Sequence, residues 1–248
     1  MSVYYKDDNV TLHFGDWRKI LPDHFTADLI IADPPYGETS LEWDTWPEGW
    51  PSLAARHSSS MWCFGSMRMF LRRRDEFAAW RLSQDIVWEK HNGSSLATDR
   101  FSRVHEHALH WYRGPWSDVH HQTPLTPDAT ARTVRRKSIA AQWQGNRGPS
   151  EYVSSDGGPR LMRSVVFARS MHGRAINETQ KPVPLLLPLI SYGCPPGGTV
   201  LDLFSGSLEA VRILGQGRKA VGFETRESQC QAAARRLSQG VLDIGGAS

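Results

Sequence analysis

Four consecutive residues bring together a carboxylate, two prolines and an aromatic ring: Asp33, Pro34, Pro35 and Tyr36. The prolines fix φ and remove two backbone donors, so carbonyl oxygens face a rigid, apolar-walled notch. Asp33 and a neighbouring backbone carbonyl can then accept both hydrogens of one amino group, while Tyr36 can stack on a planar base. The alternative, a proline turn with an N-capping Asp, leaves the aromatic residue unexplained. We therefore predict that these four residues carry chemistry at an amino nitrogen.

A second group of residues indicates a site for a nucleoside cofactor. The stretch Asp202-Leu203-Phe204-Ser205-Gly206-Ser207 begins in an expected strand and ends in a turn that contains glycine. Folds of alternating strands and helices bind ligands at such carboxyl ends, where glycine lets the backbone approach the ligand. Glu224 lies 22 residues after Asp202, where it can accept hydrogen bonds from ribose hydroxyls. An ordinary strand-to-helix turn is the alternative.

The elements that must position these residues are short apolar runs that alternate with helix-like segments. Residues 27–32 form an apolar run closed by two prolines, which is typical of a buried parallel strand. Strands that alternate with helices predict a doubly wound, mostly parallel sheet. The expected strands are residues 11–16, 27–32, 60–65, 84–90, 107–112, 199–204 and 219–224. The expected helices are residues 67–80 after an N-capping Ser66, 183–192 with a kink at Pro188, a segment that ends near 216, and 228–239 with Ser228 as N-cap.

The middle of the chain lacks this periodicity and is basic. Between residues 131 and 174 there are nine basic residues against two acidic ones, although the whole chain has a net charge of only +3. Such a block suggests a polyanionic partner, with a solvated flexible loop as the alternative. We therefore divide the chain into two halves of one domain, residues 1–113 and 176–248, and an inserted basic segment, residues 114–175.

Composition favours a cytosolic α/β protein. The chain has 248 residues, 40% of them hydrophobic, enough for one large domain with a real core. No apolar run approaches the roughly 20 residues that span a bilayer, and the N-terminus does not resemble a signal peptide. The three cysteines are isolated in the sequence, which predicts reduced thiols, no zinc site and no disulfide.

Together these segments resemble the DNA amino-methyltransferases, the adenine-N6 and cytosine-N4 group. Their catalytic motif is Asp, Asn or Ser followed by Pro-Pro and an aromatic residue, as in Asp33 to Tyr36. Their cofactor motif, D-P-F-x-G-S-G, is similar to Asp202 to Leu208. The catalytic motif comes first and the basic segment lies between the two, an order that resembles the permuted β class. Further similar segments are Gly15-Asp16 and residues 87–92, 103–107 and 177–182.

The resemblance implies a Rossmann-like methyltransferase fold with a seven-stranded sheet and circularly permuted motif order. It also implies S-adenosylmethionine as cofactor, S-adenosylhomocysteine as product, and no metal. The catalytic residues would be Asp33, Pro34, Pro35 and Tyr36. The cofactor-binding residues would be Asp16, Asp33, Lys181, Asp202, Phe204, Ser205, Gly206, Ser207 and Glu224. Leu208 stands where the family has its second glycine, so its side chain could crowd the methionine part of the cofactor.

The implied reaction is site-specific DNA methylation, as in restriction-modification systems. The target base must be flipped out of the duplex, and its amino nitrogen then attacks the sulfonium methyl directly. Adenine-N6 is favoured over cytosine-N4 because Asp at the first motif position resembles the adenine enzymes more often. Alternatives are an RNA or protein N-methyltransferase and an inactive DNA-binding relative that has lost the cofactor through Leu208.

The partner implied by the resemblance is double-stranded DNA in the cytoplasm of a bacterium or phage-infected cell. Arginines supply phosphate contacts and guanine readout, so the basic segment is the candidate target-recognition region. Its predicted DNA-binding residues are Arg132, Arg135, Arg136, Lys137, Arg147 and Arg163. Relatives in the β class often dimerise, so a homodimer is an open expectation. The sequence reveals neither a recognition site nor a partner nuclease.

Overall fold

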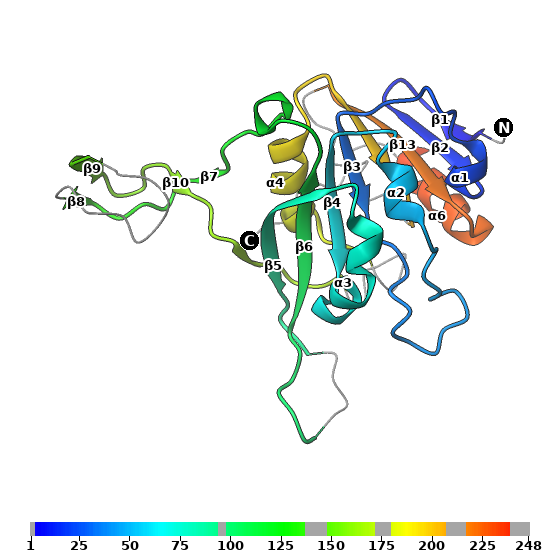
Figure 1. The fold of residues 1–248 in the computed structure, drawn as a ribbon, viewed down its shortest axis with the longest axis horizontal. Helices are drawn as coiled ribbons and strands as arrows, with labels where there is room; N and C mark the ends of the chain where they lie inside the picture. Colours follow the sequence, from blue (N-terminus) through cyan, green and yellow to red (C-terminus); the bar gives the residue numbers. More distant parts are fainter. Residues whose placement is uncertain (1–2, 94–97, 137–147, 172–179, 207–216, 239–248) are drawn as a thin grey trace. The chain divides into compact units, whose positions relative to one another are not determined.

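A nine-stranded sheet organises the larger of two units in the computed structural model (Figure 1). The structure describes residues 3–93, 98–136, 148–171, 180–206 and 217–238. One unit consists of residues 1–122 and 164–248, and the other of residues 123–163. The sheet runs in the order β1-β2-β13-β12-β3-β4-β6-β5-β11. Its strands are β1 (Val3–Lys6), β2 (Val10–Phe14), β3 (Leu29–Ala32), β4 (Ser60–Gly65), β5 (Arg81–Glu89), β6 (His105–Tyr112), β11 (Val165–Phe167), β12 (Thr199–Asp202) and β13 (Lys219–Glu224).

The sheet is mostly parallel, as predicted, but it has nine strands and not seven. Parallel pairs link β2 to β13, β13 to β12, β12 to β3, β3 to β4 and β11 to β5, and the other three pairs are antiparallel. The seven predicted strands are the inner ones. At one edge, β1 folds back on β2 because the Asp7 carboxylate accepts the N–H groups of Asn9 and Val10. At the other edge, β11 adds to β5.

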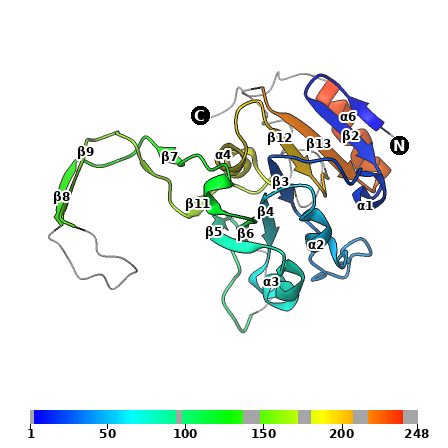
Figure 2. The same cartoon turned by 45° about the horizontal axis from the view of Figure 1, so that its top comes forward.

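Helices cover both faces of this sheet (Figure 2). They are α1 (Trp17–Ile20), α2 (Trp50–Ala54), α3 (Met67–Arg73), α4 (Val183–Gly193) and α6 (Glu227–Ser238), with 3-10 turns η1 (Arg74–Phe77) and η2 (Trp116–Asp118). Side chains alternate along a strand. In β4, Met61 and Cys63 pack in the core with α2 and α3, whereas the indole of Trp62 donates to the Leu189 carbonyl of α4. In β13, Ala220 packs with Cys230 of α6. The predicted doubly wound arrangement is therefore confirmed.

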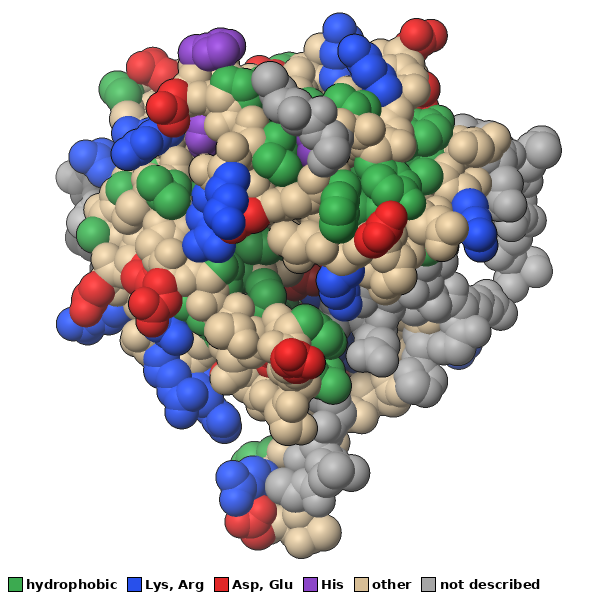
Figure 3. Space-filling model, turned by 90° about the vertical axis from the view of Figure 1, so that its right-hand side faces the viewer, with side chains coloured by type: hydrophobic (Ala, Val, Ile, Leu, Met, Phe, Trp, Pro, Cys, Tyr) green, Lys and Arg blue, Asp and Glu red, His purple; other side chains and the backbone are tan. Residues whose placement is uncertain are grey.

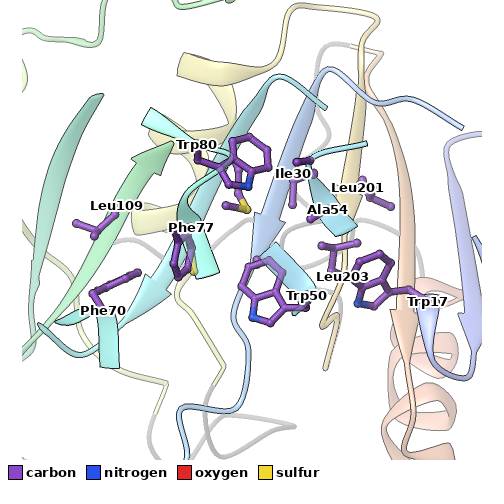
Figure 4. Close-up of a cluster of buried hydrophobic side chains, with 14 of the residues drawn as sticks. Trp17, Ile30, Trp50, Ala54, Phe70, Phe77, Trp80, Leu109, Leu201 and Leu203 are labelled. Carbon is purple, nitrogen blue, oxygen red and sulfur yellow. The ribbon is translucent and has the colours of Figure 1, made fainter. Parts of the chain in front are cut away.

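The core between the sheet, α2 and α3 is rich in aromatic side chains (Figure 4). Trp50 and Phe77 are almost fully buried and meet edge to face at 6.0 Å between ring centroids. Trp50 also contacts Phe204, at 5.2 Å. Since Phe204 is the second residue after β12, this packing fixes the turn that ends the strand. Among the described residues, no helix is long and apolar enough to cross a membrane.

Several helix boundaries differ from the predictions. Ser66 caps α3 as predicted, because its hydroxyl accepts from the Met69 N–H at 3.0 Å. The predicted helix 67–80 is shorter, however, and turns into η1 at Arg74. The predicted N-cap Ser228 is wrong, because α6 begins at Glu227 and includes it. The segment predicted as a helix ending near residue 216 lies outside the described residues.

The unit formed by residues 123–163 consists of two short antiparallel ribbons. One pairs β7 (Leu125–Thr126) with β10 (Arg160–Leu161), and the other pairs β8 (Arg132–Arg136) with β9 (Ser150–Ser154). This unit lies within the basic segment 114–175, where the sequence left a loop system and a poorly regular subdomain as alternatives. The ribbons support the second alternative.

Candidate active site

The predicted catalytic and cofactor residues gather at the edge of the sheet that is formed by the carboxyl ends of its parallel strands. Asp33 follows β3, Asp202 ends β12 and Glu224 ends β13, and these three strands are parallel neighbours. Since β6 is antiparallel to β4, its first residues, including Glu106, lie at the same edge. The sheet topology thus brings four carboxyl groups from distant parts of the sequence to one place.

A cavity of about 320 Å³ opens at this edge beside β12 and β13. Its walls include the apolar side chains of Trp17, Phe204 and Phe223. Eight of the nine predicted cofactor residues line it. These are Asp16, Asp33, Lys181, Asp202, Phe204, Ser205, Gly206 and Glu224. The ninth, Ser207, lies outside the described residues, as does Leu208.

A second cavity, of about 390 Å³, lies on the other side of Asp33. All four predicted catalytic residues, Asp33 to Tyr36, line it, together with Trp88, Lys90 and Glu106. The side chains common to both cavities are Asp33, Pro35, Trp43, Gln180 and Lys181. A ligand in one cavity would therefore meet a ligand in the other at Asp33. We call the first the β12 cavity and the second the Tyr36 cavity.

The carboxylate of Asp33 has two partners that the sequence did not predict. Its Oδ1 accepts a hydrogen bond of 2.8 Å from the Tyr36 hydroxyl, and its Oδ2 accepts one of 2.6 Å from Lys181 Nζ. Burial raises the pKa of Asp33, and although Lys181 and Tyr36 oppose this effect, the pKa stays above its ordinary value. The Tyr36 ring, predicted to stack on a base, is thus held through its hydroxyl.

Lys181 and Asp33 belong to a network of four charged side chains. Lys181 Nζ also lies 3.5 Å from Glu106 Oε2, and Lys90 Nζ pairs with Glu106 Oε1. Burial alone would lower the pKa of Lys181, but Asp33 and Glu106 outweigh it and raise that pKa. Burial would raise the pKa of Glu106, yet Lys181 and Lys90 hold it below its ordinary value. Both groups are therefore charged at neutral pH.

Asp202 is a buried carboxyl group without a nearby cation among its described contacts. Its Oδ1 accepts a hydrogen bond of 3.2 Å from the Phe204 N–H. Burial raises the pKa of Asp202 to about 7, and the charges of Asp33 and Glu224 add to this effect. The side chain therefore titrates near neutral pH. A cationic group bound in the β12 cavity would favour its charged form.

The opposite end of the β12 cavity is closed by polar side chains. Glu224 Oε1 accepts the backbone N–H of Arg226 at 2.7 Å, and the Arg226 guanidinium lies over the ring of Trp43, 5.0 Å from its centroid. Asp16 caps α1 and pairs with Arg18. That hydrogen bond to Arg18 is the main reason why the pKa of Asp16 is lowered. These contacts fix the positions of two acidic side chains at the cavity wall.

The loop that follows Tyr36 is ordered by one carboxylate. Asp44 accepts the backbone N–H groups of Gly37, Glu38 and Thr39 at 2.8–3.0 Å. These hydrogen bonds, with one from the Thr39 hydroxyl, lower the pKa of Asp44 although burial acts to raise it. The loop in turn places Trp43 in the wall of both cavities.

The predicted DNA-binding residues fall in the unit formed by residues 123–163. Arg132 and Arg135 lie on β8, Arg136 ends that strand, and Arg163 is exposed at the end of the unit. Lys137 and Arg147 lie outside the described residues. Arg135 forms an exposed ion pair of 3.4 Å with Glu151 on β9. On the face of the molecule shown in Figure 3, basic and acidic side chains are interspersed.

Several residues that line the cavities were not predicted. Glu106 and Lys90 lie in segments that resembled the family, but no role was assigned to either. The sequence feature that could have identified them is a charged residue at or next to the end of an expected strand. Trp43 and Arg226 gave no such signal, because their contact joins a loop to a distant strand end.

Comparisons with known proteins agree with this geometry. The chain is similar to YubD of Escherichia coli (strain K12), a protein described as a methylase. The two are 33% identical over 102 residues, which is 40% of this chain and 45% of YubD. The structure of M1.HpyAVI in complex with SAM has a TM-score of 0.62 at 20% identity and covers 92% of this chain and 99% of its own. PvuII DNA methyltransferase (cytosine-N4-specific) has a TM-score of 0.64 at 14% identity, with coverage of 99% and 90%. These two share the fold.

The match to YubD spans less than half of that relative. A match to a family model covers much more of the chain. The model of the N6/N4 group, described as DNA methylase, matches residues 27–235. This range contains both the Asp33 motif and the Asp202 turn, and it takes in most of the sheet. The chain therefore belongs to the DNA methylase family.

Proposed function

We propose that the chain transfers a methyl group from S-adenosylmethionine to the exocyclic amino nitrogen of a flipped DNA base. The observation that carries this proposal is the meeting of two cavities at Asp33 and Lys181. Methyl transfer needs the donor methyl and the acceptor nitrogen in line and about 3–3.5 Å apart. Two adjoining cavities that share one carboxylate provide such a junction.

The residues of the β12 cavity fit S-adenosylmethionine. Apolar side chains such as Phe204 and Phe223 suit the adenine ring, and Glu224 suits the ribose hydroxyls. Asp202 is buried with its pKa raised to about 7, which suits a ligand that brings positive charge. The bound cofactor would supply an electrophilic methyl group on sulfur. Asp16 and Lys181 line the same cavity and would complete the set.

The residues of the Tyr36 cavity would hold the base. Flipping a base costs a few kcal/mol, partly recovered by stacking on Tyr36, worth roughly 1–3 kcal/mol. The amino nitrogen is a poor nucleophile because its lone pair delocalises into the ring. Hydrogen bonds from its hydrogens to Asp33 and to the Pro34 carbonyl favour a tetrahedral nitrogen with a localised lone pair. After transfer, a proton leaves the nitrogen for Asp33 or water.

The basic segment would recognise the DNA. Ribbons of two strands can enter the major groove. In the register of β8 and β9, Arg132 stands opposite Ser154 and Val134 opposite Tyr152. That face therefore carries an arginine and an aromatic ring, whereas Arg135 on the other face is paired with Glu151. We propose that the face of Arg132 contacts the duplex. We also keep the division of the chain at residues 114 and 175 as a proposal.

Adenine-N6 is the proposed target, on the resemblance of the Asp33 motif alone. Cytosine-N4 is the alternative, and the fold similarity to a cytosine-N4-specific enzyme keeps it open. A homodimer, a partner nuclease and a cytoplasmic location stay predictions from the resemblance.

The test is methylation of unmodified genomic DNA with labelled S-adenosylmethionine, followed by mass spectrometry of the nucleosides. We expect N6-methyladenine in the DNA and no transfer to RNA or protein. Asp33→Ala should abolish transfer while calorimetry still shows cofactor binding. Turnover by this variant at the wild-type rate would refute the mechanism. DNA binding without cofactor binding in the wild type would show an inactive relative.

A further inference from the structure

The ammonium group of Lys181 lies between two partly buried carboxylates. It is 2.6 Å from Asp33 Oδ2 and 3.5 Å from Glu106 Oε2. The side chain of Lys181 is only 7% exposed, and that of Glu106 is 15% exposed. Glu106 lines the Tyr36 cavity but not the β12 cavity. The second carboxylate is therefore on the side where the base would enter.

One oxygen of the Glu106 carboxylate is paired with a lysine, and the other accepts no hydrogen bond of good geometry from the described residues. Lys90 pairs with its Oε1. Its Oε2 is buried and makes no hydrogen bond of good geometry within the described part of the chain, although Lys181 Nζ is 3.5 Å away. A buried carboxylate oxygen without a hydrogen bond is costly, because it has lost its hydrogen bonds to water. Glu106 Oε2 could therefore accept a hydrogen bond from Lys181 if the ammonium moved slightly closer.

Asp33, in contrast, has both oxygens engaged, by Tyr36 and Lys181. A carboxylate can accept further hydrogen bonds, but a donor at 2.6 Å with full positive charge occupies the best site on Oδ2. An entering amino group would have to compete with it. Of the two donors, Lys181 has a second carboxylate, that of Glu106, within 3.5 Å that could receive it.

We propose that Lys181 is a positioning residue whose ammonium moves from Asp33 to Glu106 when the target amino group enters, and that Glu106 is there to receive it. This inference rests on the proposed function. The movement is small, since a charge-assisted hydrogen bond of about 2.7–2.9 Å lies within about 1 Å of the present 3.5 Å contact. Asp33 Oδ2 is then available to accept an amino hydrogen.

The chemical step that follows is balanced without any other reactant. A bond forms between the amino nitrogen and the methyl carbon as the bond from that carbon to sulfur breaks, and its electron pair stays on sulfur. The nitrogen becomes cationic and then loses one proton to Asp33 or water. Lys181 keeps its protons throughout, paired with Glu106.

Glu106→Gln tests this proposal, because it keeps the size of the side chain and removes its charge. Lys181 should then remain on Asp33. We expect kcat to fall roughly tenfold to a hundredfold, the range that corresponds to one charge-assisted hydrogen bond. The Kd for S-adenosylmethionine should stay within twofold of wild type. The control is Glu89→Gln, an exposed residue at the end of β5, which should change neither quantity.

Two further measurements separate positioning from a structural role. In a Lys181→Met background, Glu106→Gln should cost less than about threefold in kcat, because no ammonium needs to be received. The acid limb of the kcat–pH profile should move to lower pH in Glu106→Gln. Glu106 contributes to the raised pKa of Asp33, whose other charged or titratable neighbours are Lys181, Tyr36, Cys63 and Asp202.

The outcomes distinguish this inference from the proposed function. Full kcat in Glu106→Gln, an equal cost in both backgrounds, or a parallel loss of cofactor binding and melting temperature would each overturn the role of Glu106. In those cases wild type would still methylate DNA. Absence of methyl transfer by the wild-type chain would instead overturn the proposed function itself.

Discussion

Replacing Asp202 by asparagine should stabilise the protein, and more so as the pH rises. The carboxyl group is buried at the end of β12, and burial raises its pKa from the ordinary 3.8 to about 7. A group whose folded pKa is above its unfolded value holds a proton in the folded state that the unfolded chain has lost. The free energy of unfolding therefore falls as the pH rises through this window and is lowest above pH 7.

The size of the effect follows from the two pKa values. At about 1.36 kcal/mol for each tenfold change in proton affinity, ionised Asp202 costs about 4 kcal/mol of stability at pH 8. At pH 5 the cost is smaller, roughly 1–2 kcal/mol, since the folded group is still protonated. The amide that replaces the carboxyl group cannot ionise. The difference in unfolding free energy between Asp202→Asn and wild type should thus grow by roughly 2–3 kcal/mol between pH 5 and pH 8.

Urea unfolding followed by tryptophan fluorescence at several pH values measures this difference. Comparing two proteins at each pH removes the contributions of titrating groups that do not interact with Asp202. Asp23→Asn is the control, because the Asp23 side chain is 91% exposed and its substitution should give a constant difference. A constant difference for Asp202→Asn as well would refute the inference that Asp202 is a buried carboxyl with a raised pKa. A difference that shrinks with rising pH would also refute it.

Two further predictions concern the walls of the site and the ribbon. Trp43→Ala removes the ring beneath Arg226 and a wall of both cavities, so the Kd for S-adenosylmethionine, measured by calorimetry, should rise roughly two- to tenfold; an unchanged Kd would contradict a role for this contact. Arg132→Ala should weaken DNA binding and reduce the slope of log K against log salt by about 1, as measured by fluorescence anisotropy. Arg135→Ala should have the smaller effect because Arg135 is paired with Glu151, and the reverse order would contradict the assigned face.

Much of the inner part of the fold could be predicted because its central strands, such as β3 and β4, are buried on both faces. Residues 60–65 and 219–224 were predicted as strands and coincide with β4 and β13. Both have a continuous apolar run and a sharp end. The two edge strands had no such signal. In β1 two of the four residues are exposed and the others are half-buried, and β11 has three residues. Their pairing depends on the edge offered by a neighbouring strand.

The candidate site could be predicted where a residue ends or directly follows a buried strand. Asp33, Asp202 and Glu224 all do so, and the parallel order of the sheet brings them together. The role of Lys181 was only partly anticipated, because it was assigned to the cofactor and its bond to Asp33 depends on how α4 begins. Glu106 required the register of β6 against β5, where it stands opposite Trp88. A local sequence pattern does not contain that register.

The charges around Asp33 suggest why the site tolerates such costly burial. Among the described residues there, Asp33, Glu106, Asp202 and Glu224 are acidic, and Lys90, Lys181 and Arg226 are basic. With every group ionised, one negative charge is in excess. Asp202 is the buried carboxyl group without a cationic partner among its described contacts, and its burial raises its pKa and lowers the stability of the folded protein. A third lysine would relieve this cost, but it would also repel a cationic ligand. S-adenosylmethionine carries a sulfonium charge that its product lacks, so an unpaired buried carboxylate would favour the cofactor over the product. The unpaired carboxylate of Asp202 would then lower the stability of the free protein and favour binding of S-adenosylmethionine over its product.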